Sequence, residues 1–180
     1  EERSGIWREA GARRKLRSLD VSGAADRLSV EVRYELPTKP ASEAVLVYEV
    51  LGSGEIGISL RLLPGAGLPE IPEVGLLLEL DESLDRLRWY GRGPHENYAD
   101  RLTGARLGIY SGLVAEQLTP YLRPQEAGNK TGVRWAELTG ADGFGLRVDG
   151  QPEVELNTLP YTPETLEAAD HAYKLPVSDR

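Results

Sequence analysis

Apolar and polar side chains alternate without a break between positions 28 and 36 of the chain. The even-numbered positions, from Leu28 to Leu36, hold aliphatic side chains or tyrosine, and the odd-numbered positions from Ser29 to Glu35 hold polar or charged ones. Successive side chains of a β-strand point to opposite faces, so a period of two predicts a strand with one buried face and one face in water. A helix, which repeats every 3.6 residues, would mix the two kinds of side chain on each face.

The same alternation returns several times along the chain. It covers the segments 56–62, 74–80, 87–89, 144–148 and 154–156. A nearly continuous apolar run at 44–51 predicts a strand that is buried on both faces. Residues that tight turns need separate these segments, at 37–40, 52–54, 64–72 and 139–143. Many short strands with frequent turns predict an all-β sandwich or barrel rather than a parallel α/β sheet.

Two short helices are predicted near the ends of the chain. The residues from Trp7 to Lys15 favour the first. The second is capped by Thr162, has Pro163 in its first position and continues from Glu164 to Ala172. No repeat and no low-complexity linker divides the sequence, so we expect a single domain over residues 1–180.

Charge and composition exclude several classes of partner and site. The chain has 21 Lys and Arg against 29 Asp and Glu, a formal net charge of −8, which argues against nucleic acid and against an anionic membrane surface. It has no Cys and only two His, so neither thiolate chemistry nor a Cys/His metal site is expected. No apolar run is long enough to span a bilayer. A cation held by loop carbonyls stays open, because such sites leave little trace in a sequence.

Residues 89–106 concentrate the side chains that could carry a binding function. Two glycines and a proline end the strand at Tyr90, and the loop that follows gathers aromatic, acidic, amide and basic groups. Aromatic rings stack on the C–H face of a pyranose, while carboxylate, amide and guanidinium groups bind its hydroxyls. The candidate carbohydrate-binding residues are Trp89, Tyr90, Arg92, His95, Glu96, Asn97, Tyr98, Asp100 and Arg101. The alternative is a loop whose polar side chains satisfy its own backbone, with Tyr98 as a buried anchor.

The stretch from Trp89 to Gly104 resembles the signature loop of the C-terminal domain, or small chain, of the β-galactosidases of glycoside hydrolase family two. The likeness extends over nearly all of the chain. Further similar motifs are Trp7-Arg8-Glu9-Ala10-Gly11, Leu36-Pro37, Thr119-Pro120-Tyr121, Arg123-Pro124-Gln125-Glu126, Gly128-Asn129-Lys130-Thr131, Val133-Arg134-Trp135 and Leu159-Pro160-Tyr161-Thr162-Pro163-Glu164. That domain is an antiparallel β-supersandwich related to galactose mutarotase, so the resemblance implies this fold, with one or two short helices.

The resemblance implies a non-catalytic domain. In the complete enzymes of the family a separate (β/α)8 barrel carries the two glutamates that cleave the glycoside, and such a pair lies about 5–5.5 Å apart in retaining enzymes. The present chain resembles no part of that barrel, so we assign no catalytic residue to it. Its expected role is to supply scaffold, oligomer contacts and part of the active-site rim to a parent enzyme that hydrolyses terminal β-D-galactosides.

The same resemblance implies the surroundings of the chain. The expected partner is the remainder of the parent β-galactosidase, and a galactoside substrate is met only indirectly. We expect no cofactor in this chain, Mg and Na ions in the parent enzyme, a cytoplasmic location and a role in lactose catabolism. The sequence has no Met and begins with Glu1, which predicts a truncated domain taken from a longer polypeptide. A truncated sandwich leaves strand edges unpaired, so self-association into a homo-oligomer is also expected.

Two alternatives stay open at this level. Because the fold is shared with galactose mutarotase, His95 beside Glu96 could form an acid/base pair that opens a sugar ring. A stand-alone carbohydrate-binding module could instead use the aromatic side chains as a platform, although such side chains on sheets are more often core or loop anchors. The aromatic residues concerned are Trp89, Tyr90, Tyr98, Tyr110, Tyr121 and Trp135.

Overall fold

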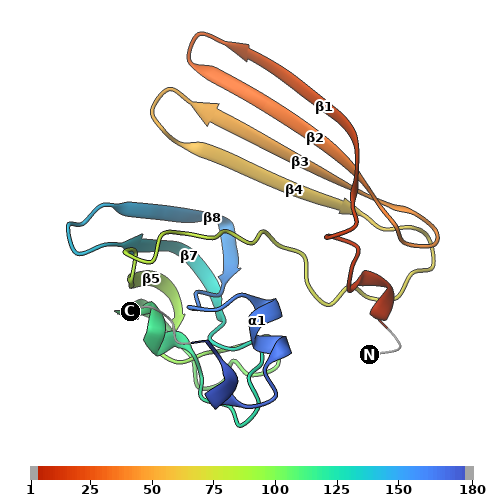
Figure 1. The fold of residues 1–180 in the computed structure, drawn as a ribbon. Helices are drawn as coiled ribbons and strands as arrows, with labels where there is room; N and C mark the ends of the chain where they lie inside the picture. Colours follow the sequence, from red (N-terminus) through yellow and green to blue (C-terminus); the bar gives the residue numbers. More distant parts are fainter. Residues whose placement is uncertain (1–3, 177–180) are drawn as a thin grey trace. The chain divides into compact units, whose positions relative to one another are not determined.

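The computed structural model describes residues 4–176, and the chain divides into two compact units between Leu78 and Glu79. The first unit is a four-stranded antiparallel sheet with the strand order β1-β2-β3-β4 (Figure 1). Its strands are β1 (Lys15–Ala24), β2 (Arg27–Leu36), β3 (Ser42–Leu51) and β4 (Ile56–Leu63). The strands predicted at 28–36, 44–51 and 56–62 are confirmed, with ends that agree within two residues.

The register of this sheet explains the alternation along β2. Val32 lies opposite Leu19 of β1 and Leu46 of β3, so apolar side chains line up across the strands on one face. The neighbouring residue Arg33 points to the other face, where its guanidinium forms an ion pair with Glu43 of β3 at 3.0 Å. A shift of the register by one residue would exchange the two faces, so the pattern fixes the pairing.

The first unit has a small core, formed by residues before β1 and at the end of β2. Trp7 and Leu36 are buried together, and the indole N–H of Trp7 donates a hydrogen bond to the carbonyl oxygen of Pro69 at 3.0 Å. Strand β3 is buried on both faces at Val45 and Leu46, which are 4% and 8% exposed, but its end is exposed to solvent. The prediction of a strand buried on both faces therefore holds only for the first half of β3.

The helix predicted from Trp7 to Lys15 is wrong. A single 3-10 turn, η1 (Gly5–Trp7), is followed by turns, and β1 begins at Lys15. Of the predicted helix only Lys15 joins the sheet, opposite Glu35 of β2. Residues 8–13 form turns, and Gly11 among them costs about 1 kcal/mol relative to alanine inside a helix.

The second unit is a four-stranded antiparallel sheet with the order β6-β5-β7-β8. Its strands are β5 (Arg86–Gly93), β6 (Arg106–Leu113), β7 (Lys130–Thr139) and β8 (Gly145–Leu156). The core of this unit consists of Leu87, Trp89, Val133, Ala136 and Leu138. The two segments predicted as strands at 144–148 and 154–156 belong to the single strand β8, whose register on β7 shifts twice.

Helical structure is short in the described residues. Besides η1, the elements are η2 (Val114–Gln117), α1 (Pro163–Ala168) and η3 (Ala172–Lys174). The predicted cap is confirmed, because the hydroxyl oxygen of Thr162 accepts a hydrogen bond from the N–H of Thr165 at 3.3 Å. The helix α1 ends four residues earlier than predicted, since Ala169 takes an extended conformation and packs into the core at 5% exposure.

The segment 74–80 does not form the strand that its alternation predicts. It is irregular and exposed over its whole length, and it spans the boundary between the two units. Elsewhere the class is confirmed, because both sheets are antiparallel and helices are few and short among residues 4–176. No described helix is long and apolar enough to cross a membrane. The single domain over residues 1–180, and the packing of two sheets into one supersandwich, stay predictions.

Candidate functional site

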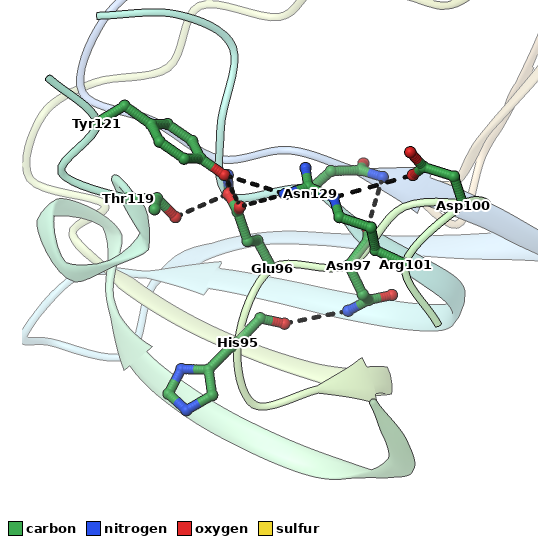
Figure 2. Close-up of polar contacts among 9 residues, drawn as sticks. His95, Glu96, Asn97, Asp100, Arg101, Thr119, Tyr121 and Asn129 are labelled. Carbon is green, nitrogen blue, oxygen red and sulfur yellow. Dashed lines mark hydrogen bonds and ion pairs between the residues drawn. The ribbon is translucent and has the colours of Figure 1, made fainter. Parts of the chain in front are cut away.

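The candidate residues lie in β5 and in the loop that follows it, and a second loop of the same unit contacts this first loop. The first loop, 94–105, joins β5 to β6, and the second, 118–129, runs from η2 to the start of β7. A backbone hydrogen bond joins them, from the N–H of Asn97 to the carbonyl oxygen of Asn129 at 2.8 Å. Figure 2 shows side chains from the two loops meeting around Glu96 and Asn97.

The glycines at the end of β5 allow the core to close beneath the first loop. A Cβ atom on Gly93 would lie 2.8 Å from the ring of Tyr110, and one on Gly91 would lie 2.9 Å from the side chain of Val133. Because glycine has no Cβ, the Trp89 and Tyr110 rings can pack with their centroids 5.4 Å apart. The Gly-Arg-Gly motif therefore serves packing at the base of the loop.

Asn97 joins the first loop to strand β7. The residue is 1% exposed. Its side-chain amide nitrogen donates to the carbonyl oxygens of Arg92 at 3.3 Å and His95 at 3.1 Å. Its amide oxygen accepts from the N–H of Thr131 at 3.0 Å and from the hydroxyl of Thr131 at 2.6 Å. Both donors and both acceptors of the carboxamide are used, so none is left for a ligand.

Asn129 extends this network to strand β8. Its amide nitrogen donates to the carbonyl oxygen of Asn97 at 3.1 Å and to the carboxylate of Glu155 at 2.7 Å. The residue is 5% exposed. The two asparagines therefore hold together five parts of the second unit, namely both loops, β5, β7 and β8.

The carboxylate of Glu96 lies between the two loops. It accepts hydrogen bonds from the Thr119 hydroxyl at 2.7 Å, from the Gly128 N–H at 2.9 Å and from the Tyr121 hydroxyl. Burial by itself raises the pKa of Glu96, but these three donors and the charge of Arg101, 3.5 Å away, outweigh burial and lower the pKa. Glu96 is therefore an ionised acceptor at neutral pH, and its role is to fasten the second loop to the first.

Gly128 has the backbone conformation that this contact requires. Its φ is +77°, a region that L side chains rarely adopt, and this places its N–H toward Glu96.

Arg101 contacts the two loops from the exposed side. Its guanidinium lies 4.6 Å from the ring centroid of Tyr98 and donates to the Tyr121 hydroxyl at 3.2 Å. Burial, together with the charges of Glu126 and Glu96, raises the pKa of Tyr98 to about 12.

Lys130 is a buried cation that was not among the predicted site residues, although it lies in the Gly128-Asn129-Lys130-Thr131 motif. It is 2% exposed, its ammonium donates to the carbonyl oxygen of Gly128 at 2.6 Å, and it lies 5.3 Å from the ring centroid of Trp89. Burial lowers the pKa of Lys130 to about 8, although the charge of Glu96 opposes this shift. Lys130 follows a Gly-Asn pair and stands in no alternation of apolar residues, so its burial could not be predicted from the sequence.

The nine candidate residues fall into three groups by exposure. Trp89 and Asn97 are buried and serve packing and loop structure. The half-buried residues are Tyr90, Arg92, Glu96 and Tyr98, and the exposed ones are His95, Asp100 and Arg101. The structure brings Glu96, Asn97, Tyr98 and Arg101 together at the two loops. Tyr90 follows Trp89 in a strand and so points to the opposite face, where its ring centroid lies 6.4 Å from that of Trp135.

The remaining candidates make local contacts. Arg92 donates to the carbonyl oxygen of Ala105 at 3.3 Å, and Asp100 lies 3.9 Å from the Arg101 guanidinium. The imidazole of His95 points away from the carboxylate of Glu96 (Figure 2). Among residues 4–176, no cluster of His, Cys, Asp and Glu side chains could hold a metal ion. Carbohydrate binding by the half-buried and exposed candidates stays a prediction.

Comparison with known proteins extends the likeness over the whole chain. The family model described as β-galactosidase small chain matches residues 1–180. A β-galactosidase of Priestia megaterium is 48% identical over 178 residues, which are 99% of this chain and 17% of that protein. β-Galactosidases of Halalkalibacterium halodurans and Lactobacillus delbrueckii subsp. bulgaricus are 37% and 39% identical, over 96% and 94% of this chain and 18% and 17% of theirs. The present chain thus spans less than a fifth of the length of these relatives, and it belongs to the β-galactosidase small-chain family.

Proposed function

We propose that this chain is a non-catalytic part of a β-galactosidase, where it supplies scaffold to a parent enzyme that hydrolyses terminal β-D-galactosides. Family membership over residues 1–180 and the small share of the relatives' length that the chain spans support this role. The observation that carries the proposal is the hydrogen bonding of Glu96 and Asn97. Their polar atoms bind other parts of the chain, so the motif that looks like a binding site serves the structure of the two loops.

The acid/base properties of the loops agree with this role. Retaining hydrolysis needs one carboxylic acid that is protonated near neutral pH and a second carboxylate about 5–5.5 Å away. Glu96 has a lowered pKa and accepts three hydrogen bonds, so it cannot act as the acid. Substrate cleavage in the parent is therefore assigned to residues outside this chain.

The isolated 180-residue chain is expected to show no turnover of a chromogenic β-galactoside, whereas the parent enzyme turns it over. In the parent, Glu96→Gln is expected to change kcat by less than about tenfold, because a general acid or base contributes about a hundredfold to ten-thousandfold. Steady-state kinetics measure both values. Turnover by the isolated chain, or loss of kcat by a hundredfold or more in a folded Glu96→Gln parent, would refute the proposal.

The two alternatives have specific tests. A mutarotase needs a histidine and a carboxylate that face one substrate, and His95 and Glu96 point apart (Figure 2). Polarimetry of α-galactose with the chain decides this question, because a mutarotase speeds the loss of optical rotation.

A carbohydrate-binding module would give a saturable change of tryptophan fluorescence at millimolar galactose, and a flat response favours the scaffold. Mg and Na ions in the parent, its oligomeric state and a cytoplasmic location stay predictions.

A further inference from the structure

Residues 73–80 have the side-chain pattern of a strand, yet they belong to no sheet in the described structure. Their alternate positions Val74, Leu76, Leu78 and Leu80 are apolar and are 43–57% exposed. Leu77, on the opposite face of an extended segment, is 63% exposed. A run of large aliphatic side chains in water marks a surface that another part of a protein covers.

The backbone of this segment is unpaired as well. Within residues 4–176, none of residues 73–80 lies in a helix or strand or makes a backbone hydrogen bond to another segment. A Cβ atom built on Gly75 would come no closer than 4.0 Å to its nearest neighbour, the carboxylate of Glu73, so no other segment lies against the backbone on that side. A backbone with free N–H and C=O groups can pair with a neighbouring strand.

The next strand along the chain cannot supply the missing partner. A formed turn follows the segment, in which Asp81 accepts hydrogen bonds from the N–H groups of Ser83 and Leu84, each at 3.0 Å. Such a turn commonly joins two strands of a hairpin. The strand after it is β5, which pairs with β6 on one side and with β7 on the other. Both edges of β5 are occupied, so a hairpin with residues 73–80 is blocked.

We propose that residues 73–80 form a β-strand in the parent protein, paired with a strand from polypeptide outside these 180 residues. The relatives contain more than four-fifths of their length outside the matched region, which provides such a partner. The partner is an extended segment with apolar residues at alternate positions, because the apolar face of Val74 and Leu76 must be covered as the backbone pairs.

Hydrogen exchange followed by mass spectrometry tests this assignment without any substitution. In the parent protein, amides of residues 73–80 are expected to exchange at least about a hundredfold more slowly than in the isolated chain, because paired strand amides open rarely. Amides of β3, which are paired in this chain, serve as the control and are protected in both. Equally fast exchange in both proteins refutes the proposal.

Two further outcomes also decide the question. Protection in the isolated chain that grows with protein concentration would identify a second copy as the partner and would overturn the assignment. Protection in the isolated chain at every concentration would mean that a partner strand lies within these 180 residues, which would overturn it too.

A matched pair of variants tests which face is covered. In the parent, Leu76→Asp is expected to abolish most of the protection of residues 73–80, because it places a charge on the covered face. Leu77→Asp, the same change one residue later, points to the other face and is expected to alter the exchange rate less than about threefold. Equal effects of the two substitutions would contradict a strand with one covered face.

This inference rests on the proposed function only in that the chain is part of a longer polypeptide. The two can fail separately. A parent without galactosidase activity that still protects residues 73–80 refutes the proposed function alone, and an active parent with fast exchange at these residues refutes the strand alone.

Discussion

Asn97→Ala is expected to lower the free energy of unfolding of the second unit by about 3–5 kcal/mol. The substitution removes four hydrogen bonds in a site where the residue is 1% exposed. The carbonyl oxygens of Arg92 and His95 and the N–H and hydroxyl of Thr131 then lose this partner, and an unsatisfied buried polar group costs about 1–3 kcal/mol. Urea unfolding of the unchanged chain and of the variant, followed by tryptophan fluorescence, measures the change, and the buried Trp89 reports on the second unit in variants that lack Trp7 and Trp135.

A matched substitution separates this network from the loss of an amide in general. Asn157 is exposed, and Asn157→Ala is expected to change the free energy of unfolding by no more than about 0.5 kcal/mol. If Asn97→Ala costs less than about 1 kcal/mol, the two loops and β7 do not depend on this side chain, and the structural role assigned to the motif is incorrect.

The alternation of apolar residues was sufficient to predict three strands of the first unit, but not β1 and not two strands of the second unit. In β6 the core-facing positions are Gly108, Tyr110 and Gly112, and the apolar Leu107 and Ile109 face outward. The ring of Tyr110 lies beside Gly108, and the side chains of Gln117 and Glu116 lie beside Gly112, so the core-facing positions show no apolar repeat. In β7 the first buried residues are polar. They are Lys130 and Thr131, whose ammonium and hydroxyl groups form hydrogen bonds within the chain.

The failure at residues 73–80 has a different cause. The alternation there is as regular as in β4, yet a strand needs a neighbour, and the described structure pairs residues 73–80 with no strand. Side-chain periodicity reports which face of a segment is to be buried, whereas pairing depends on polypeptide that the pattern does not describe. The helix predicted from Trp7 to Lys15 is absent for another reason, because residues 8–13 form turns around Gly11, which disfavours a helix.

The composition of the first loop identified the correct region of the site but left the roles of its residues undecided. Asn97 and Thr131 are 34 positions apart, and Glu96 and Gly128 are 32 apart, so no local pattern could reveal that they bind one another. The sugar-binding interpretation and the loop-anchor interpretation use the same residue types. Only the burial and the hydrogen-bond partners show that Asn97 and Glu96 anchor the loops.

The stability of the chain is expected to rise between about pH 8 and pH 10 because of Lys130. The pKa of the Lys130 ammonium is about 8 in the folded chain, whereas a lysine exposed to water, as in the unfolded chain, has a pKa of 10.5. Between these two values the unfolded chain therefore binds more protons than the folded chain. Stability rises with pH wherever the unfolded state binds more protons, and below pH 8 the full cost of burying the charge is present. One pKa unit corresponds to about 1.4 kcal/mol, which gives a gain of about 2 kcal/mol by pH 10.

Lys130→Met isolates this contribution, because it fills a similar volume without a titrating group. The free energy of unfolding of the unchanged chain, minus that of the variant, is expected to rise by about 2 kcal/mol from pH 7 to pH 10 in urea titrations. The window ends at pH 10 because the raised pKa of Tyr98, about 12, acts in the opposite direction above it. A difference that stays constant with pH would mean that the ammonium keeps its ordinary pKa, which is incompatible with a cation buried between Gly128 and the Trp89 ring.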